Sequence, residues 1–179
     1  MNYDNITIKQ YYNLIKANDY ETELDKRIAM LAAVNDLTFE EVEEWTVGRI
    51  NSEAKKYSFL GEPIKSKVQP RWNGYEFTIK LNDLRADQMI DYLELTKNDL
   101  TFELHSLLAI LETSKKDYQE KQKHILETCP ITIAQGVSNF FLHKYSLSTK
   151  AIQSYSLSKM KELERLTKMN QDLLRAELS

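Results

Sequence analysis

The side chains with the widest chemical repertoire in this sequence are three histidines and a single cysteine. His105, His124 and His143 follow one another at intervals of 19 residues, which matches no metal-binding motif, because ligands from one element stand only a few residues apart. Cys129 precedes Pro130 at a predicted helix start, where the helix dipole can lower the pKa of a thiol. A lone thiol is nevertheless far more often inert, and it excludes both an intramolecular disulfide and a thiolate metal cluster. The sequence therefore predicts no catalytic residue, no metal and no cofactor.

Phosphate loops and paired carboxylates are disfavoured as well. Phosphate loops need clustered glycines so that the backbone can approach the anion, whereas the 4 glycines of this chain stand singly. Glutamates are dense within residues 40–44, but adjacent positions of a helix point in different directions and do not converge on one substrate. These glutamates are typical of a solvated helix N-terminus, where the helix dipole favours negative charge.

Nucleic acid is an unfavourable partner on electrostatic grounds. Residues 24–34 and 38–45 have the lengths of a DNA-binding helix-turn-helix, but the second helix would bring glutamates rather than cations to the phosphates. The net charge of −3 is unevenly distributed, with 13 Lys+Arg against 20 Asp+Glu through Thr113 (−7) and 11 against 7 from Ser114 onward (+4). An acidic body with a basic tail suits self-association or a two-part partner, although solvated helix faces account for the same charges.

The elements that carry these side chains are predicted to be mainly helices. Only 4 glycines and 3 prolines are present, too few for the many turns of a β-sandwich or barrel. Thr7 and Thr38 each precede helical periodicity and supply the hydroxyl of an N-cap, and Gly61 is predicted to end a helix in the left-handed conformation. The apolar spacing predicts helices over residues 7–17, 24–34, 38–45, 46–60, 83–97, 100–111, 115–127 and 130–142.

Apolar residues identify the faces of these helices that are expected to be buried. The helix of residues 100–111 is so rich in leucine that it is predicted to be central. The helices of residues 7–17 and 83–97 have narrower apolar faces. Their members are Tyr11, Tyr12, Leu14 and Ile15 in the first, and Met89, Ile90, Tyr92, Leu93 and Leu95 in the second.

A β-hairpin is predicted between the two helical halves of the chain. Apolar and polar residues alternate from Tyr75 to Leu81, as in a half-buried strand. Asn73-Gly74 is a strong type I′ turn signal, and residues 64–72 are the predicted partner strand. An isolated hairpin is unstable in water, so this one must pack on helices or pair with another chain.

The predicted partner strand lies at an edge of the hairpin, because Pro70 has no N–H to donate. Trp72 and Tyr75 stand beside this edge. They are therefore candidate protein-contact residues, with a structural role in the hairpin as the alternative.

The C-terminal residues 148–178 contain no helix breaker and predict one long helix. About 30 helical residues would span roughly 45 Å, so part of this helix is expected to project. Its apolar stripe is narrow, as in a coiled-coil seam, which suits a helix-in-groove contact with a partner as well as docking on the protein's own core. The candidate contact residues of this stripe are Leu163, Leu166, Met169 and Leu173.

Together these patterns predict a mainly α protein, with one β-hairpin at about residues 64–81 and a long C-terminal helix. The predicted domains are an N-terminal helical subdomain (1–62), a hairpin and helical subdomain (63–147) and the extended C-terminal helix (148–179). The N-terminus lacks the basic start and apolar run of a signal peptide. No apolar stretch approaches the roughly 18 residues of a membrane helix. A soluble cytoplasmic protein without membrane contact is therefore expected.

Three stretches carry a resemblance to known proteins: residues 6–12 (Ile-Thr-Ile-Lys-Gln-Tyr-Tyr), 23–28 (Glu-Leu-Asp-Lys-Arg-Ile) and 37–42 (Leu-Thr-Phe-Glu-Glu-Val). They resemble small proteins encoded among the virion genes of tailed phages, including phages of Bacteroides-type hosts. Residues 139–141 (Asn-Phe-Phe) and the helical tail fit the same pattern. Many such proteins are tail assembly chaperones, which are mostly helical and often multimerise. The resemblance lies in the order and spacing of these short stretches of sequence. Because it contains no catalytic or ligand-binding motif, it assigns no functional residue in this chain.

The resemblance implies a non-enzymatic assembly factor of a tailed phage, namely a tail assembly chaperone that shields a tail or tape-measure protein. Exposed amphipathic surface suffices for such shielding. The expected partners are other phage structural proteins or copies of the chain in a homo-oligomer, in the host cytoplasm during assembly. One alternative is a stoichiometric virion component, such as a head–tail connector or cargo protein, located in the virion. Another is a protein that binds a host factor.

Overall fold

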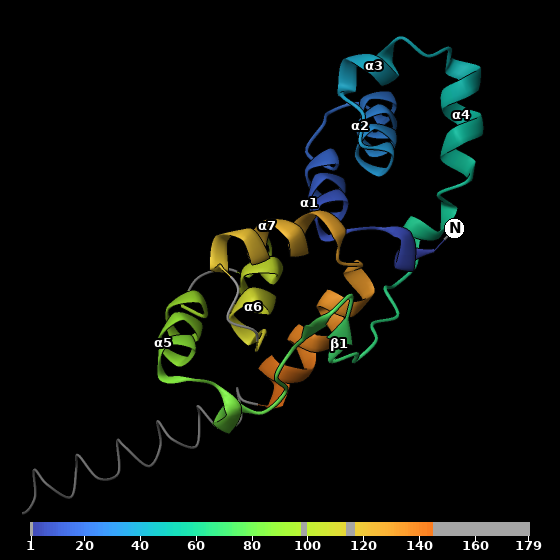
Figure 1. The fold of residues 1–179 in the computed structure, drawn as a ribbon. Helices are drawn as coiled ribbons and strands as arrows, with labels where there is room; N and C mark the ends of the chain where they lie inside the picture. The colour runs from blue at the N-terminus through green and yellow to red at the C-terminus, as the bar shows by residue number, and fades with distance from the viewer. Residues whose placement is uncertain (1, 98–99, 114–116, 145–179) are drawn as a thin grey trace, which may run out of the picture. The chain divides into compact units, whose positions relative to one another are not determined.

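The computed structural model describes residues 2–97, 100–113 and 117–144, and these residues are mainly helical, as the composition predicts (Figure 1). Contacts group Met1–Phe140 into one unit. The predicted C-terminal helix of residues 148–178 lies outside the described residues, together with its candidate residues Leu163, Leu166, Met169 and Leu173. The helices of the unit are α1 (Ile8–Ala17), α2 (Glu23–Asn35), α3 (Phe39–Glu43), α4 (Val47–Lys55), α5 (Ala86–Leu95), α6 (Leu104–Leu111), α7 (Tyr118–Thr128) and a further helix that begins at residue 131.

α1 and α2 form an antiparallel pair that is held at one end by Gln10. The predicted N-cap is confirmed: the Thr7 hydroxyl accepts a hydrogen bond from the Gln10 backbone N–H at 3.2 Å, and the Gln10 side-chain oxygen accepts one from the Thr7 N–H at 3.0 Å. The Gln10 amide nitrogen then donates to the Val34 carbonyl (3.2 Å) and to the Asp36 carboxylate (2.9 Å). Asp36 ends α2 in the left-handed conformation, with φ 53°. The start of α1 is thereby tied to the end of α2.

The predicted helix of residues 46–60 is interrupted. α4 ends at Lys55, and a short 3-10 turn, Ser58–Gly61, follows it. Tyr57, at the interruption, is buried, and its hydroxyl donates to the Asn35 side chain at 3.1 Å, so the chain turns here to bring this ring inside. The prediction for Gly61 is wrong: the described residues with positive φ are Asp36 and the two residues of the hairpin turn.

The hairpin is shorter than the alternation predicts. β1 (Arg71–Trp72) pairs with β2 (Tyr75–Glu76) in antiparallel register, and Trp72 lies opposite Tyr75. Both turn residues have positive φ, 46° at Asn73 and 80° at Gly74, as a type I′ turn requires.

The predicted strand at residues 64–70 is not formed, because this segment lies along a helix instead. The Lys67 N–H donates to the Thr132 carbonyl at 2.9 Å. Gly136 permits the close approach, since a Cβ at this position would lie 1.9 Å from the Lys67 carbonyl oxygen. The backbone N–H of Lys67 is therefore bonded to the helix that begins at residue 131, and the described residues 64–70 form no strand.

A third stretch of chain stabilises the hairpin. Phe77 forms an isolated antiparallel bridge with Glu112. The Thr78 N–H donates to the Leu111 carbonyl at 2.7 Å, and the Thr113 N–H donates to the Glu76 carbonyl at 3.0 Å. The end of α6 thus supplies the partner that an isolated hairpin lacks.

α6 is the centre of the unit, as predicted. All residues from Ser106 to Leu111 are buried, and α6 packs against α7 and α5, which flank it in Figure 1. Ile125 of α7 is fully buried beside it. Burying an aliphatic side chain of this size stabilises a fold by roughly 1.5–3 kcal/mol. No helix within the described ranges is long and apolar enough to cross a membrane.

Candidate protein-binding site

The reactive side chains singled out from the sequence are mostly engaged in packing. Cys129 has an exposed fraction of 0%, and burial raises the pKa of its thiol to about 12. A thiol with such a pKa remains protonated at neutral pH and is a poor nucleophile. Within the described part of the chain, no group of three or more His, Cys, Asp or Glu side chains could hold a metal ion.

His105 joins α6 to α1 through Tyr12. The Tyr12 hydroxyl accepts a hydrogen bond from the Leu104 N–H at 2.8 Å and lies 3.4 Å from the His105 Nδ1 atom. Burial raises the pKa of Tyr12 and lowers the pKa of His105. Both groups are therefore held neutral where the two helices meet, which indicates a packing role.

The hairpin residues Trp72 and Tyr75 stack on each other, with ring centroids 5.9 Å apart and an interplanar angle of 10°. The ring of His124, from α7, lies 5.5 Å from Tyr75 and 6.4 Å from Trp72. Tyr75 is only 7% exposed, and burial raises its pKa. Tyr75 thus belongs mainly to the packing of the hairpin on α7. The half-buried Trp72 keeps part of its ring accessible, and its contact with a partner stays a prediction.

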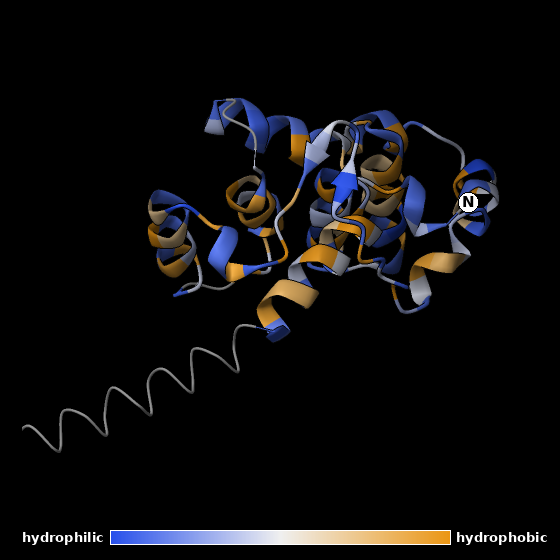
Figure 2. Cartoon of the chain, turned by 60° about the horizontal axis from the view of Figure 1, so that its bottom comes forward, coloured by the Kyte–Doolittle hydropathy of each residue, from blue (hydrophilic) through white to orange (hydrophobic). Residues whose placement is uncertain are grey.

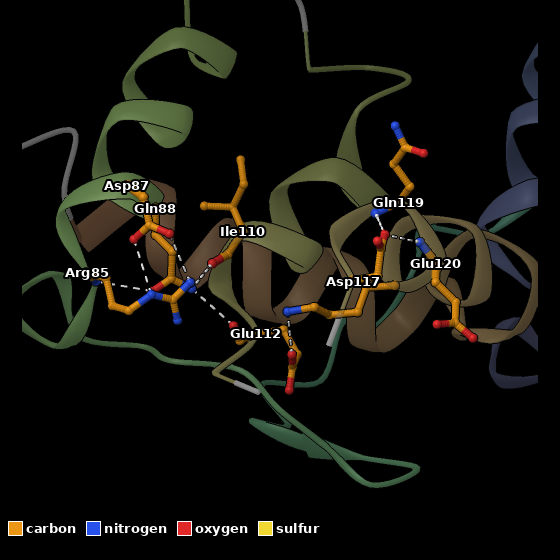
Figure 3. Close-up of polar contacts among 9 residues, drawn as sticks. Arg85, Asp87, Gln88, Ile110, Glu112, Asp117, Gln119 and Glu120 are labelled. Carbon is orange, nitrogen blue, oxygen red and sulfur yellow. Dashed lines mark hydrogen bonds and ion pairs between the residues drawn. The ribbon is translucent and has the colours of Figure 1, made fainter. Parts of the chain in front are cut away.

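A buried polar cluster at the end of α6 was not predicted from the sequence (Figure 3). Glu112 and Lys121 form an ion pair at 2.9 Å with side chains 1% and 5% exposed. The Gln88 amide nitrogen donates to the Ile110 carbonyl at 2.6 Å and to the Glu112 carbonyl at 3.0 Å. The available signal was the position of Lys121, one helical turn before the buried Ile125 on the same face of α7. This cluster fixes α5 and α7 to the end of α6.

A concave surface lies between α1 and α2, and we refer to it as the α1–α2 groove. Its volume is about 690 Å³, within the range of about 300–1,000 Å³ typical of ligand sites. Its apolar lining residues are Tyr11, Leu14, Ile15, Met30, Leu60 and Ile64.

Helical spacing explains why two helices face one groove. From α1 and its C-cap, residues 11, 14, 15 and 18 line it, with Ala17 beside them, and from α2, residues 23, 26, 27 and 30. Each set follows the i, i+3, i+4, i+7 pattern of one helix face. The groove face of α1 differs from its core face, where Ile8 and Tyr12 are buried. The groove face of α1 is thus additional to the residues that pack against α2 and α6, such as Gln10 and Tyr12.

The remaining wall of the groove is the segment of residues 60–64, which Tyr3 holds in place. The Tyr3 hydroxyl donates to the Leu60 carbonyl at 2.8 Å and to the Glu62 carbonyl at 3.1 Å. The Tyr3 ring also packs edge-on against Phe59, with centroids 5.2 Å apart. Burial is the main cause that raises the Tyr3 pKa. This wall is thus positioned by specific contacts before any ligand arrives.

The rim of the groove carries balanced charge. Lys26 forms an ion pair with Glu23 at 3.5 Å, and the Arg27 guanidinium donates to the Asn51 side chain at 2.9 Å. Opposite them stands Glu62. Two cations and two anions along the lining favour neither a strongly acidic nor a strongly basic ligand, and a partner would meet the apolar side chains of α1 together with a largely charged face of α2.

The sequence analysis did not identify this groove. The periodicity predicted that Tyr11, Tyr12, Leu14 and Ile15 form a single buried face. In the structure Tyr12 is buried in the core, whereas Leu14 and Ile15 are half-buried along the groove. Comparisons with models of known protein families, with curated proteins and with solved structures find no match to this chain.

Proposed function

We propose that this chain is a non-enzymatic protein-binding factor in the assembly of a tailed phage, acting as a tail assembly chaperone, and that its α1–α2 groove holds an apolar helical segment of the partner. The observation that carries the binding proposal is the groove itself, which Tyr11, Leu14 and Ile15 of α1 line together with Met30 of α2. The phage setting rests on the resemblance of residues 6–12, 23–28 and 37–42.

The chemistry of the groove suits a helical segment better than a small polar ligand. Leu14, Ile15 and Met30 are half-buried in the free chain, so a partner side chain would complete the removal of their apolar surface from water. An amphipathic helix laid in an apolar groove anchors itself through side chains at i, i+3, i+4 and i+7. A chaperone that shields such segments needs this surface and no active site.

Affinity capture with matched variants tests the groove. The tagged full-length chain is produced together with the other virion proteins of its phage, and co-purifying proteins are identified and quantified by mass spectrometry. The variants Leu14→Glu and Met30→Glu place a charge in the apolar walls, while the control Ser52→Glu places the same charge on an exposed position of α4. Circular dichroism establishes that each variant is folded.

We expect one tail or tape-measure protein to co-purify with the wild type and with Ser52→Glu, and its yield to fall about ten-fold or more with both groove variants, as at a binding hot spot. Equal yield with folded groove variants would show that the groove is not the binding site. Mass spectrometry of purified particles then distinguishes the two virion roles. Absence of the chain supports a chaperone, and many copies per particle would instead identify a structural component.

A further inference from the structure

α5 presents its apolar side chains to solvent in helical register. It buries Gln88 and Tyr92, whereas Ile90 is 58% exposed and Leu93 is 47% exposed. The exposed Ala86 precedes them, so that the three residues follow the i, i+4, i+7 pattern of one row. We refer to Ala86, Ile90 and Leu93 as the apolar row of α5. Figure 2 shows apolar and polar residues side by side on the turns of this helix.

A row of carboxylates runs beside the apolar row. Asp87, Asp91 and Glu94 repeat the same spacing one residue later, which places them about 100° further around the helix. Arg85 forms an ion pair with Asp87 at 3.1 Å. Within the described ranges, Asp91 and Glu94 form no ion pair, so the acidic row retains negative charge that a partner can neutralise.

α5 is held firmly in this orientation. The Gln88 side chain bonds to the end of α6 through two carbonyl groups and accepts a hydrogen bond from the Arg85 N–H at 3.1 Å. Figure 3 shows these contacts on the side of α5 that faces α6. Because the buried side is fixed, the two rows are preorganised for a partner, which lowers the entropic cost of binding.

We infer that α5 is a docking surface for a partner helix that has a row of aliphatic side chains beside a row of lysines or arginines. The apolar row supplies hydrophobic contact, and the acidic row selects cations through charge complementarity. A second copy of α5 is disfavoured, because it would bring carboxylates against carboxylates. The inference goes beyond the proposed function, since the α1–α2 groove has a balanced rim and selects no charge.

The chain's own residues 159–175 fit this chemistry less well. Leu163, Leu166 and Leu173 share one side of the helix that the sequence predicts there. The basic residues Lys161, Arg165 and Lys168 fall on the opposite side, so that a single lysine, Lys159, and no basic row adjoins the leucines. An α5 partner needs the two rows side by side. The occupant is therefore a helix of another protein.

Two synthetic peptides test the charge selection. Both are helical, about five turns long, and carry the same row of leucines; one has lysines in the neighbouring row and the other has glutamates. Binding to the full-length chain is measured by fluorescence anisotropy. The variants are Ile90→Ser/Leu93→Ser in the apolar row and Asp91→Lys/Glu94→Lys in the acidic row. Glu40→Lys/Glu43→Lys on α3 is the control for net charge.

The lysine peptide should bind the wild type at least about ten-fold more tightly than the glutamate peptide. The apolar-row variant should weaken binding of both peptides, the acidic-row variant should reverse the preference, and the control should preserve it. Equal binding of the two peptides, or the same reversal with the α3 control, would overturn the inference. Both peptides are also measured against Leu14→Glu, which blocks the α1–α2 groove. The preference for the lysine peptide should remain in this variant, so that failure here and failure of the groove proposal are separate results.

Discussion

α5 and α6 are consecutive helices of similar length and both are rich in apolar residues, but their packing differs. Six consecutive residues of α6, Ser106–Leu111, are buried, whereas α5 buries Gln88 and Tyr92 and exposes Ile90 and Leu93. α6 is thus covered along most of its length, while α5 buries residues of one face only. Apolar residues of this protein therefore have two roles. Some stabilise the core, and others form exposed surface that its own chain leaves uncovered.

The largest expected effect of a single substitution lies in α6. Leu107 is completely buried, so Leu107→Ala should lower the free energy of unfolding by about 2–5 kcal/mol through lost burial and a residual cavity. Leu93→Ala, the same chemical change on α5, should cost less than about 1 kcal/mol. Urea denaturation of the two variants measures both values, and similar losses would show that α5 and α6 do not differ as described.

The second largest loss of stability is expected at the ion pair between Glu112 and Lys121. Lys121→Ala removes the ammonium group from the buried Glu112 carboxylate, and we expect a loss of about 3 kcal/mol, because a buried charge loses its partner. Lys123→Ala, an exposed position of the same helix, is the matched control and should change stability by less than about 0.5 kcal/mol. The double variant Glu112→Leu/Lys121→Met should recover most of the loss. A loss in the double variant as large as in Lys121→Ala would contradict this explanation.

Gln88 tests whether α5 is held by polar contacts. Gln88→Leu keeps a side chain of similar size but removes the donor to the Ile110 and Glu112 carbonyls, and should cost about 1–3 kcal/mol. Hydrogen exchange should accelerate in the amides of α5 more than in those of α6. Uniform acceleration over both helices would indicate that Gln88 stabilises the unit as a whole and does not anchor α5 specifically.

The smallest expected effect is a pH dependence of stability that arises from His105, where α6 contacts α1. Burial lowers the pKa of His105 below the ordinary histidine value of 6.5, so the folded state disfavours the charged imidazole. The contribution of neutral His105 to the free energy of unfolding is then fully present above about pH 6.5. It falls as the pH drops toward the folded-state pKa, because the unfolded chain binds the proton first. The loss should be below about 1 kcal/mol, since the ring is half-exposed and solvent screens its charge.

The variant His105→Gln separates this contribution from the titration of carboxylates. Free energies of unfolding are measured by urea denaturation at about pH 7.5 and about pH 5 for the wild type and the variant. The decrease between the two pH values should be smaller in His105→Gln. An equal decrease would show that His105 does not contribute to it.

Local signals in the sequence predicted the helices well. The capping residues Thr7 and Thr38, the turn at Asn73-Gly74 and the helix start after Pro130 act through their nearest neighbours in the chain, and all four are present in the structure. The central position of α6 also followed from composition, since a helix that is apolar on every side cannot face water.

The wrong predictions involve residues whose conformation depends on distant parts of the chain. Residues 64–70 alternate weakly like a strand, but Gly136 lets them lie against a helix. Tyr57 interrupts the predicted helix of residues 46–60 to reach Asn35. The α1–α2 groove and the rows of α5 were missed for a related reason. Periodicity identifies an apolar face and cannot tell whether another element covers it.

Photo-crosslinking from within the α1–α2 groove identifies the protein that occupies it. A photoreactive phenylalanine analogue replaces Leu14 in the groove, or Ser52 on the exposed surface of α4, in the full-length chain, which is produced together with the virion proteins of the phage proposed as its source. We predict that irradiation links position 14 to one tail or tape-measure protein and that position 52 gives no such product. Absence of a product from position 14, or the same product from both positions, would contradict binding through the α1–α2 groove.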